Sequence, residues 1–348
     1  QLKVDTEHKF KNMIALKLAF KNLLGAGLRT WLNVAVLSFA FVVIVFYNGM
    51  LDGWNMQGRN DTRDWEIGYG QLWHPEYDRN DPFSLQDAHG LVSEDIQTLV
   101  DENKLVPVLI TQASAYPEGR MINIFLKGIK PDQEILELPT GVLSTEDNEV
   151  PVLIGKRMAE SANLQKGDRV LVRWRDKNGT FDAREVVVAG IFDSNVPTID
   201  NGQFWLSLED LRGMTGMKDE ATLFIAGENY IGGNTGDWKF KDQKFLLKEF
   251  DDVMQQKKGS GIIIYGLLLA IALLAIFDTQ VLSVFRRQKE IGTYIALGMT
   301  RSQVVRIFTV EGSAHSVLAL ILGAIYGIPL MIYLQNVGIP MPDYADSA

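Results

Sequence analysis

The residues best able to perform chemistry do not form a recognisable active site. Gly155-Lys156 lacks the preceding glycine and the following hydroxyl residue of a phosphate-binding loop. Gly68-Tyr69-Gly70 stops short of a dinucleotide-binding fingerprint and is more typical of a strand. The chain has no Cys, which excludes a thiolate nucleophile, a Cys-ligated zinc and an iron–sulfur cluster. No pattern predicts an enzyme, and we expect no cofactor on this chain.

Metal binding is equally weakly supported. His74, His89 and Asp87 are of metal-ligating types, but the sequence has only four histidines, scattered over 348 residues. The acidic pair Asp251-Asp252 is typical of a solvated face. The sequence therefore predicts no metal site.

The most informative segment is the loop over residues 286–311. Gly298 can end one helix, and Thr300 with Gln303 forms a capping-box pattern for the next. The pattern predicts helix, tight turn and helix. A simple hairpin would need less chain, so a docking surface is favoured. Its candidate residues are Arg286, Arg287, Glu290, Ile291, Gly292, Ala296, Leu297, Gly298, Met299, Arg301 and Gln303.

This loop lies between long uncharged stretches. Residues 31–51, 259–277 and 312–342 contain no Asp, Glu, Lys or Arg, and the second continues through Asp278 to Phe285. At ~1.5 Å per residue, each is long enough for a hydrocarbon core of ~30 Å. Buried core helices are the alternative, but such helices rarely lack charge for so long. The first run is too long, and too far along the chain, to be a signal peptide. We interpret all three as membrane spans.

Charge sets the orientation. Residues 1–30 hold six basic and two acidic residues, and 286–311 hold five and two. Residues 52–258 hold 23 basic and 36 acidic residues. The positive-inside rule places the first two segments in the cytoplasm and the acidic segment outside. The spacing of apolar and basic residues over 10–30 predicts an amphipathic helix. We expect it to lie in the interface of the inner leaflet rather than on the surface of a cytoplasmic domain. Net charge of −9 argues against a nucleic-acid partner.

The outer segment is predicted to be mixed. Strands are expected over 105–111, 121–129, 168–175 and 180–192, with Asn178-Gly179 turning the last two into a hairpin. Short helices are expected over 155–164 and 208–214. Residues 52–65 and 240–257 are expected to extend the first and second spans outward as helices.

The predicted fold is therefore an α-helical membrane protein with a large mixed α+β extracytoplasmic domain between spans 1 and 2. Three spans are seen and four are expected, because residues 336–348 read as an outer loop. The predicted segments are a tail and interfacial helix over 1–30, span 1 over 31–51, the outer domain over 52–258, span 2 over 259–285, the cytoplasmic loop over 286–311, span 3 over 312–335 and the outer loop over 336–348.

The loop resembles that of the FtsX-like permease family, the membrane subunits of MacB-type ABC transporters. The family pattern is R-x-x-E-[IF]-G-x-x-x-A-L-G followed by a helix ending in Glu. The matching residues are Arg287, Glu290, Ile291, Gly292, Ala296, Leu297, Gly298 and Glu311. The outer segment is similar to lipoprotein-releasing permeases of the LolC and LolE kind, at Val152-Leu153-Ile154-Gly155, Ala159, Leu164, Gly167-Asp168, Val170, Val187 and Gly190-Ile191-Phe192.

The resemblance implies a function in the bacterial inner membrane. Two permease copies or paralogues would pair in the lipid, and each would dock an ABC ATPase on the 286–303 loop. ATP and magnesium would be bound by that ATPase, and the client would be a lipoprotein or another periplasmic amphiphile. The short segment before span 1 favours this type over MacB, which carries a fused ATPase. The alternatives are a signalling subunit that activates a cell-wall hydrolase, and an export permease for a peptide or drug.

Asp278 departs from the lipoprotein-releasing relatives, which tend to have Asn there. An ionised Asp deep in a span costs at least ~2.5 kcal/mol. Asp278 is therefore either an intramembrane functional position or close enough to the cytoplasmic side to reach water.

Overall fold

The computed structural model describes residues 28–144 and 149–338. Most of the interfacial helix predicted over 10–30, and most of the loop predicted over 336–348, lie outside the described residues. The chain divides into two compact units. One combines residues 1–54 with 253–348, and the other is the intervening segment Asn55–Asp252.

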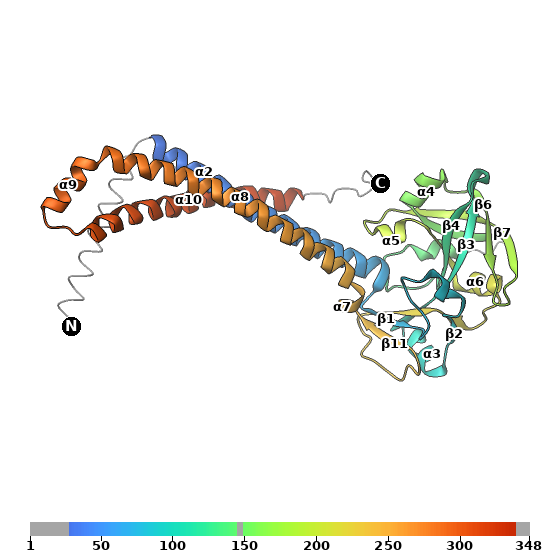
Figure 1. Ribbon diagram of the computed structural model, residues 1–348. Helices are drawn as coiled ribbons and strands as arrows, with labels where there is room; N and C mark the ends of the chain where they lie inside the picture. The colour runs from blue at the N-terminus through green and yellow to red at the C-terminus, as the bar shows by residue number, and fades with distance from the viewer. Residues whose placement is uncertain (1–27, 145–148, 339–348) are drawn as a thin grey trace. The chain divides into compact units, whose positions relative to one another are not determined.

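The first unit is built from helices. Within the described residues, three helical segments are long and apolar enough to cross a membrane, over Trp31–Ile67, Lys248–Arg286 and Arg301–Val337. Large apolar side chains such as Phe39, Leu274 and Ile325 are mostly exposed along them, as expected for surfaces that face lipid. Figure 1 shows these helices in blue, orange and red. The three long helices are α2 (Leu28–Thr62), α8 (Lys248–Arg286) and α10 (Arg301–Val337), and the short helix α9 (Gln288–Ala296) lies between the last two.

Small residues let α10 approach α2 closely. Ala319, Gly323 and Gly327 repeat every four residues along α10, on one face of the helix, and all three are buried. A Cβ atom added to Gly327 would lie 2.9 Å from Cγ2 of Val42 on α2. Without a hydrophobic driving force between helices in lipid, such close backbone packing is a main source of helix association.

A polar contact joins α2 to α8. The Asn33 side-chain amide donates to the Thr279 hydroxyl at 2.5 Å and to the Ala275 carbonyl at 3.4 Å. The rings of Tyr47 and Tyr265 meet edge to face, with centroids 6.0 Å apart. Buried polar groups in an apolar surrounding need such partners, so these contacts fix which faces of the two helices meet.

The second unit is centred on a nine-stranded sheet with the order β11-β1-β10-β3-β4-β8-β5-β7-β6. β6 also pairs with β3, so the six strands from β3 to β6 form a closed ring. A separate pair joins β2 to β9. The strands are β1 (Gly70–Trp73), β2 (Gly90–Leu91), β3 (Leu105–Tyr116), β4 (Ile122–Ile129), β5 (Val150–Gly155), β6 (Arg169–Arg175), β7 (Phe181–Phe192), β8 (Gln203–Ser207), β9 (Glu220–Ala221), β10 (Leu223–Ala226) and β11 (Lys239–Asp242).

Short helices and turns connect these strands. A π-helical turn, Arg63–Ile67, follows α2. The remaining α-helices are α3 (Glu94–Asp101), α4 (Lys156–Ala162), α5 (Pro197–Asp200), α6 (Leu208–Thr215) and α7 (Gln243–Leu246), and the 3₁₀ turns are Pro82–Gln86, Pro117–Gly119 and Thr140–Leu143. Alternate side chains of the strands fill the interior of the ring. In β6, Val170, Val172 and Trp174 are buried, and the residues between them are exposed.

Most local predictions for this unit are confirmed. The four predicted strands correspond to β3, β4, β6 and β7, and the two predicted short helices correspond to α4 and α6. Gly179 has φ +83°, the left-handed conformation that the predicted turn between β6 and β7 requires. The helix of the first span does continue beyond residue 51, because α2 runs to Thr62. The predicted mixture of apolar spans and a mixed α/β domain is confirmed.

Two local predictions are wrong in part. Helical structure within the predicted segment 240–257 begins only at Gln243, as α7, and resumes at Lys248 as α8, because residues 239–242 pair with β1 as β11 and satisfy their backbone groups there. Asp251 is not part of a plain solvated face. Its carboxylate is half-buried and accepts two hydrogen bonds from Arg59, at 2.5 and 2.6 Å.

Candidate functional site: the segment between α8 and α10

The segment between α8 and α10 folds as helix, turn and helix. α9 ends at Ala296, and Gly298 adopts φ +90°, which an L-residue with a Cβ rarely takes. The backbone N–H groups of Gly298 and Met299 donate to carbonyls of α9, both at 3.0 Å. Together they close the end of α9 with a turn of the kind that favours glycine.

A capping box starts α10. The Thr300 hydroxyl accepts from the Gln303 backbone N–H at 3.4 Å, and the Gln303 side chain accepts from the Thr300 backbone N–H at 2.9 Å. These two bonds satisfy donors that a helix start leaves unpaired. The predicted local structure of the loop is therefore confirmed.

Arg287 connects the start of α9 to α10. Its Nε donates to Glu290 Oε2 at 2.7 Å, and its Nη1 donates to Glu311 Oε2 at 3.0 Å. Its guanidinium also lies 5.3 Å from the ring centre of Phe308. Glu290 is 55% exposed at its side chain, whereas Glu311 is only 5% exposed. The ion pair between Arg287 and Glu311 is thus shielded from water.

Glu311 was not among the candidate docking residues. The sequence did mark Glu311 as a match to the family pattern. It did not predict the ion pair with Arg287, because that contact joins positions 24 residues apart. His315 lies one turn further along α10 and is also buried. Its Nδ1 lies 2.9 Å from the Glu311 carbonyl oxygen.

The surface of the segment is apolar and basic. Leu297 is 78% exposed at the turn, Ile295 is 47% exposed, and none of the α9 residues is buried. Exposed basic residues flank this apolar tip, and they are Arg286, Lys289, Arg301 and Arg306. Among the other candidates, Gly292, Ala296, Gly298 and Gln303 are exposed, and Ile291 and Met299 are half-buried. The turn therefore presents the apolar side chain of Leu297 between exposed basic residues.

Asp278 does not join this network. It is exposed on α8, while its neighbour Thr279 accepts the hydrogen bond from Asn33. Both alternatives for Asp278, the intramembrane role and solvent access, stay predictions.

The histidines of the second unit, Asn55–Asp252, which is called the outer unit below, have other partners. His89 Nδ1 contacts the Glu220 carboxylate, and the Glu76 backbone N–H donates to His74 Nδ1 at 3.3 Å. Burial lowers the pKa of His74, and nearby His89 lowers it further. No cluster of three or more metal-ligating side chains occurs within residues 28–144 and 149–338.

Comparison with known proteins finds a family match within the first unit. Residues 262–345 match the family described as FtsX-like permease C-terminal. This segment is an FtsX-like permease domain. All the loop residues that match the family pattern, from Arg287 to Glu311, lie inside it.

Curated relatives are similar over a larger part of the chain. The lipoprotein-releasing system transmembrane protein LolC of Xylella fastidiosa (strain Temecula1) is 25% identical over 240 residues, covering 61% of this chain and 57% of that protein. LolC of Neisseria meningitidis serogroup B is 22% identical over 255 residues, covering 64% and 60%. The chain therefore spans less than two thirds of the length of these relatives.

Two solved structures are weakly similar. The periplasmic region of MacB from Actinobacillus actinomycetemcomitans has a TM-score of 0.34 and 10% identity, covering 53% of this chain and 94% of that one. The extracellular domain of the noncanonic ABC-type transporter YknZ has a TM-score of 0.29 and 16% identity, covering 46% and 83%.

Proposed function

We propose that this chain is the non-catalytic permease subunit of an ATP-driven transporter, and that a separate ABC ATPase docks on α9 and the turn at 297–301. The observation that carries the proposal is the exposed Leu297 at the end of a helix anchored to α10 through Arg287. The FtsX-like match over 262–345 supports it. ATP and magnesium belong to the ATPase.

The contacts within the helical unit suggest how motion would spread. A push on α9 reaches α10 through the Arg287–Glu311 ion pair, whose Nη1–Oε2 distance is 3.0 Å. α10 packs on α2 through the glycines that face Val42, and α2 bonds α8 through Asn33. The boundaries of the outer unit, at Asn55 and Asp252, fall within α2 and α8. These two helices are thus the covalent connections through which a movement of the helices would reach the outer unit.

The names of the relatives and the charge pattern support a proposal for the client and the cellular location. The curated relatives are named as transmembrane proteins of a lipoprotein-releasing system, so we propose a lipoprotein or similar amphiphile as the client. The acidic outer unit is assigned to the periplasm and the basic α8–α10 segment to the cytoplasm, in the inner membrane. A second permease copy or paralogue completes the assembly.

The test is co-purification of the full chain from native membranes with two matched variants. Leu297→Arg puts a charge on the exposed tip, and Ile231→Arg puts one on an exposed apolar residue of the outer unit, 99% exposed. We expect wild type and Ile231→Arg to retain an ATPase and ATP-dependent lipoprotein release. Leu297→Arg should insert into the membrane but lose both, because its charge cannot enter an apolar pocket without desolvation. Full coupled activity of Leu297→Arg would refute the docking surface. Recovery of a cell-wall hydrolase in place of lipoprotein would favour the signalling alternative.

A further inference from the structure

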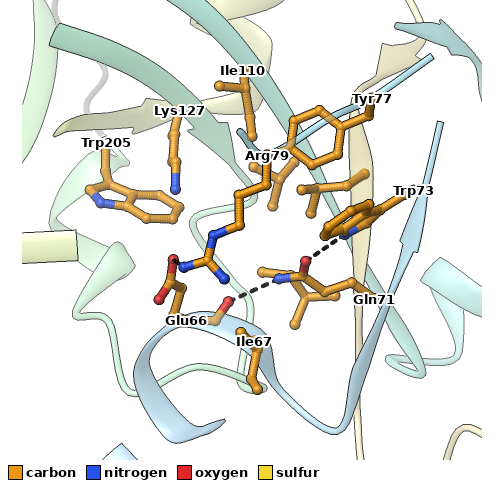
Figure 2. Close-up of a pocket in the computed structure, with 12 residues that line it drawn as sticks. Glu66, Ile67, Gln71, Trp73, Tyr77, Arg79, Ile110, Lys127 and Trp205 are labelled. Carbon is orange, nitrogen blue, oxygen red and sulfur yellow. Dashed lines mark hydrogen bonds and ion pairs between the residues drawn. The ribbon is translucent and has the colours of Figure 1, made fainter. Parts of the chain in front are cut away.

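A small cavity in the outer unit is lined by two basic side chains. Lys127 comes from β4, and Arg79 comes from the loop after β1. Glu66, in the turn that follows α2, faces the same space. Figure 2 shows the Lys127 ammonium, the Arg79 guanidinium and the Glu66 carboxylate turned toward one another, with Trp205 beside Lys127. None of these residues belongs to the docking segment.

The cavity has more hydrogen-bond donors than acceptors. Glu66 Oε1 lies 3.6 Å from Arg79 Nη2, and Glu66 Oε2 accepts from the Thr198 hydroxyl at 2.7 Å. Both carboxylate oxygens are therefore engaged. Gln71 is also occupied, because its amide nitrogen donates to the Glu66 carbonyl and its oxygen accepts from Trp73. The Lys127 ammonium has no hydrogen-bond acceptor among the described residues, and the Arg79 guanidinium, whose side chain is 33% exposed, has only the Glu66 carboxylate.

The charged side chains of the cavity are also unbalanced, with an excess of positive charge. One carboxylate faces two cations, so the cluster carries one excess positive charge when Lys127 is protonated. The Lys127 ammonium lies 4.9 Å from the ring centre of Trp205, and the remaining lining is largely apolar, including Val108 and Ile110. Burial lowers the pKa of Lys127 to about 8, so the ammonium stays charged at neutral pH. The Arg79 side chain is 33% exposed and reaches water, so the cost of the unbalanced charge falls mainly on the half-buried Lys127 ammonium.

The size of the cavity limits what could balance this charge. Its volume is about 30 Å³. That is room for about two water-sized occupants, and it is too small for a phosphate ester, a nucleotide or an acyl chain. A single monatomic anion, with at most one water, fits both the volume and the one excess charge.

We propose that this cavity is a binding site for a small monovalent anion of the chloride class, held between the Lys127 ammonium and the Arg79 guanidinium. Such an anion supplies the missing acceptor and neutralises the cluster. It also connects the loop after β1, which carries Arg79, to strand β4, which carries Lys127. Anion binding and protonation of Lys127 are coupled, because each favours the other.

The first experiment measures chloride binding directly, by the chloride NMR linewidth, on the full chain in lipid nanodiscs. Wild type is compared with Lys127→Met and with the control Lys241→Met, which removes another lysine that lies over aromatic rings, Trp73 and Phe245. We expect saturable excess broadening in wild type and Lys241→Met, and loss of that excess in Lys127→Met. Above the pKa of about 8, the wild-type affinity should fall about tenfold per pH unit. Equal broadening in all three proteins, or an affinity independent of pH, overturns the proposal.

A second measurement covers the case in which Lys127→Met does not fold. Arg79→Gln keeps Lys127 but removes the second cation, and it should weaken chloride binding at least severalfold. Crystals of the wild-type chain grown in bromide should show an anomalous peak between Lys127 and Arg79. A cavity filled by water alone, with no anomalous peak there, overturns the proposal.

Discussion

The ion pair between Arg287 and Glu311 gives the sharpest test of the docking segment. The Arg287 side chain is 17% exposed and that of Glu311 is 5% exposed. Replacing Arg287 with Ala leaves the Glu311 carboxylate buried without its cation. Breaking a buried pair in this way costs about 3–5 kcal/mol. Because Arg287 retains some access to water, we take the lower value of about 3 kcal/mol.

Glu290 provides the comparison, because it bonds the same guanidinium from the surface. Its side chain is 55% exposed, and exposed ion pairs contribute about 0.2–1 kcal/mol. Glu290→Ala should therefore loosen the start of α9 only slightly. Arg287→Ala breaks the ion pairs with both Glu290 and Glu311, whereas Glu290→Ala breaks only the exposed pair. The difference between the two variants therefore isolates the contribution of the buried pair.

Hydrogen exchange of the full chain in nanodiscs measures the local cost. For Arg287→Ala, a loss of about 3 kcal/mol corresponds to roughly a hundredfold faster exchange of amides in α9 and at the start of α10. Glu290→Ala should change these rates less than about fivefold. The double variant Arg287→Ala/Glu311→Ala should recover part of the protection, because no buried charge is left unpaired. Equal effects of Arg287→Ala and Glu290→Ala, or a double variant worse than both singles combined, would refute the argument.

Two further predictions concern other parts of the chain. Gly327→Leu should weaken packing of α10 on α2 by about 1–3 kcal/mol, because even a Cβ there lies 2.9 Å from Val42. Gly266→Leu is the control, since nothing lies within 4 Å of its added Cβ, and helix cross-linking yields should fall only in the first variant. Lys127→Met should raise the thermal midpoint of the outer unit at neutral pH in chloride-free buffer. Because burial lowers the pKa of Lys127 from 10.5 to about 8, the unfolded chain binds more protons between these values. Wild-type stability therefore rises over that range, and the advantage of the variant should shrink there; a constant difference in midpoint from neutral pH to about pH 10.5 would contradict this.

Features set by neighbours in sequence were predictable. The length of the uncharged runs defines α2, α8 and α10, and the residues around Gly298 and Thr300 determine the turn and cap of the loop. The hairpin between β6 and β7 follows from Asn178-Gly179 in the same way.

Features set by distant parts of the chain were not predictable. β11 exists because residues 239–242 meet β1, which lies about 170 residues earlier, and the local apolar spacing suggested a helix instead. The Arg287–Glu311 pair and the cavity around Lys127 likewise depend on segments that only the tertiary fold brings together. Helical spacing and turn signals carry no information about such contacts.

The pairing of β3 limits the order in which the outer unit can assemble. One edge of β3 is shared: Leu105–Val108 pairs with β10, and residues 113–116 pair with β6. The opposite edge pairs with β4. β10 lies more than one hundred residues after β3 in the chain, so the first half of that shared edge stays unpaired until residues 223–226 have been delivered. Sheets built from such distant partners fold slowly, and their open edges attract other strands. The edge of β3 that pairs with β10 is thus exposed while the segment up to residue 226 is being synthesised, and a chaperone that binds extended segments would protect the nascent chain during that interval.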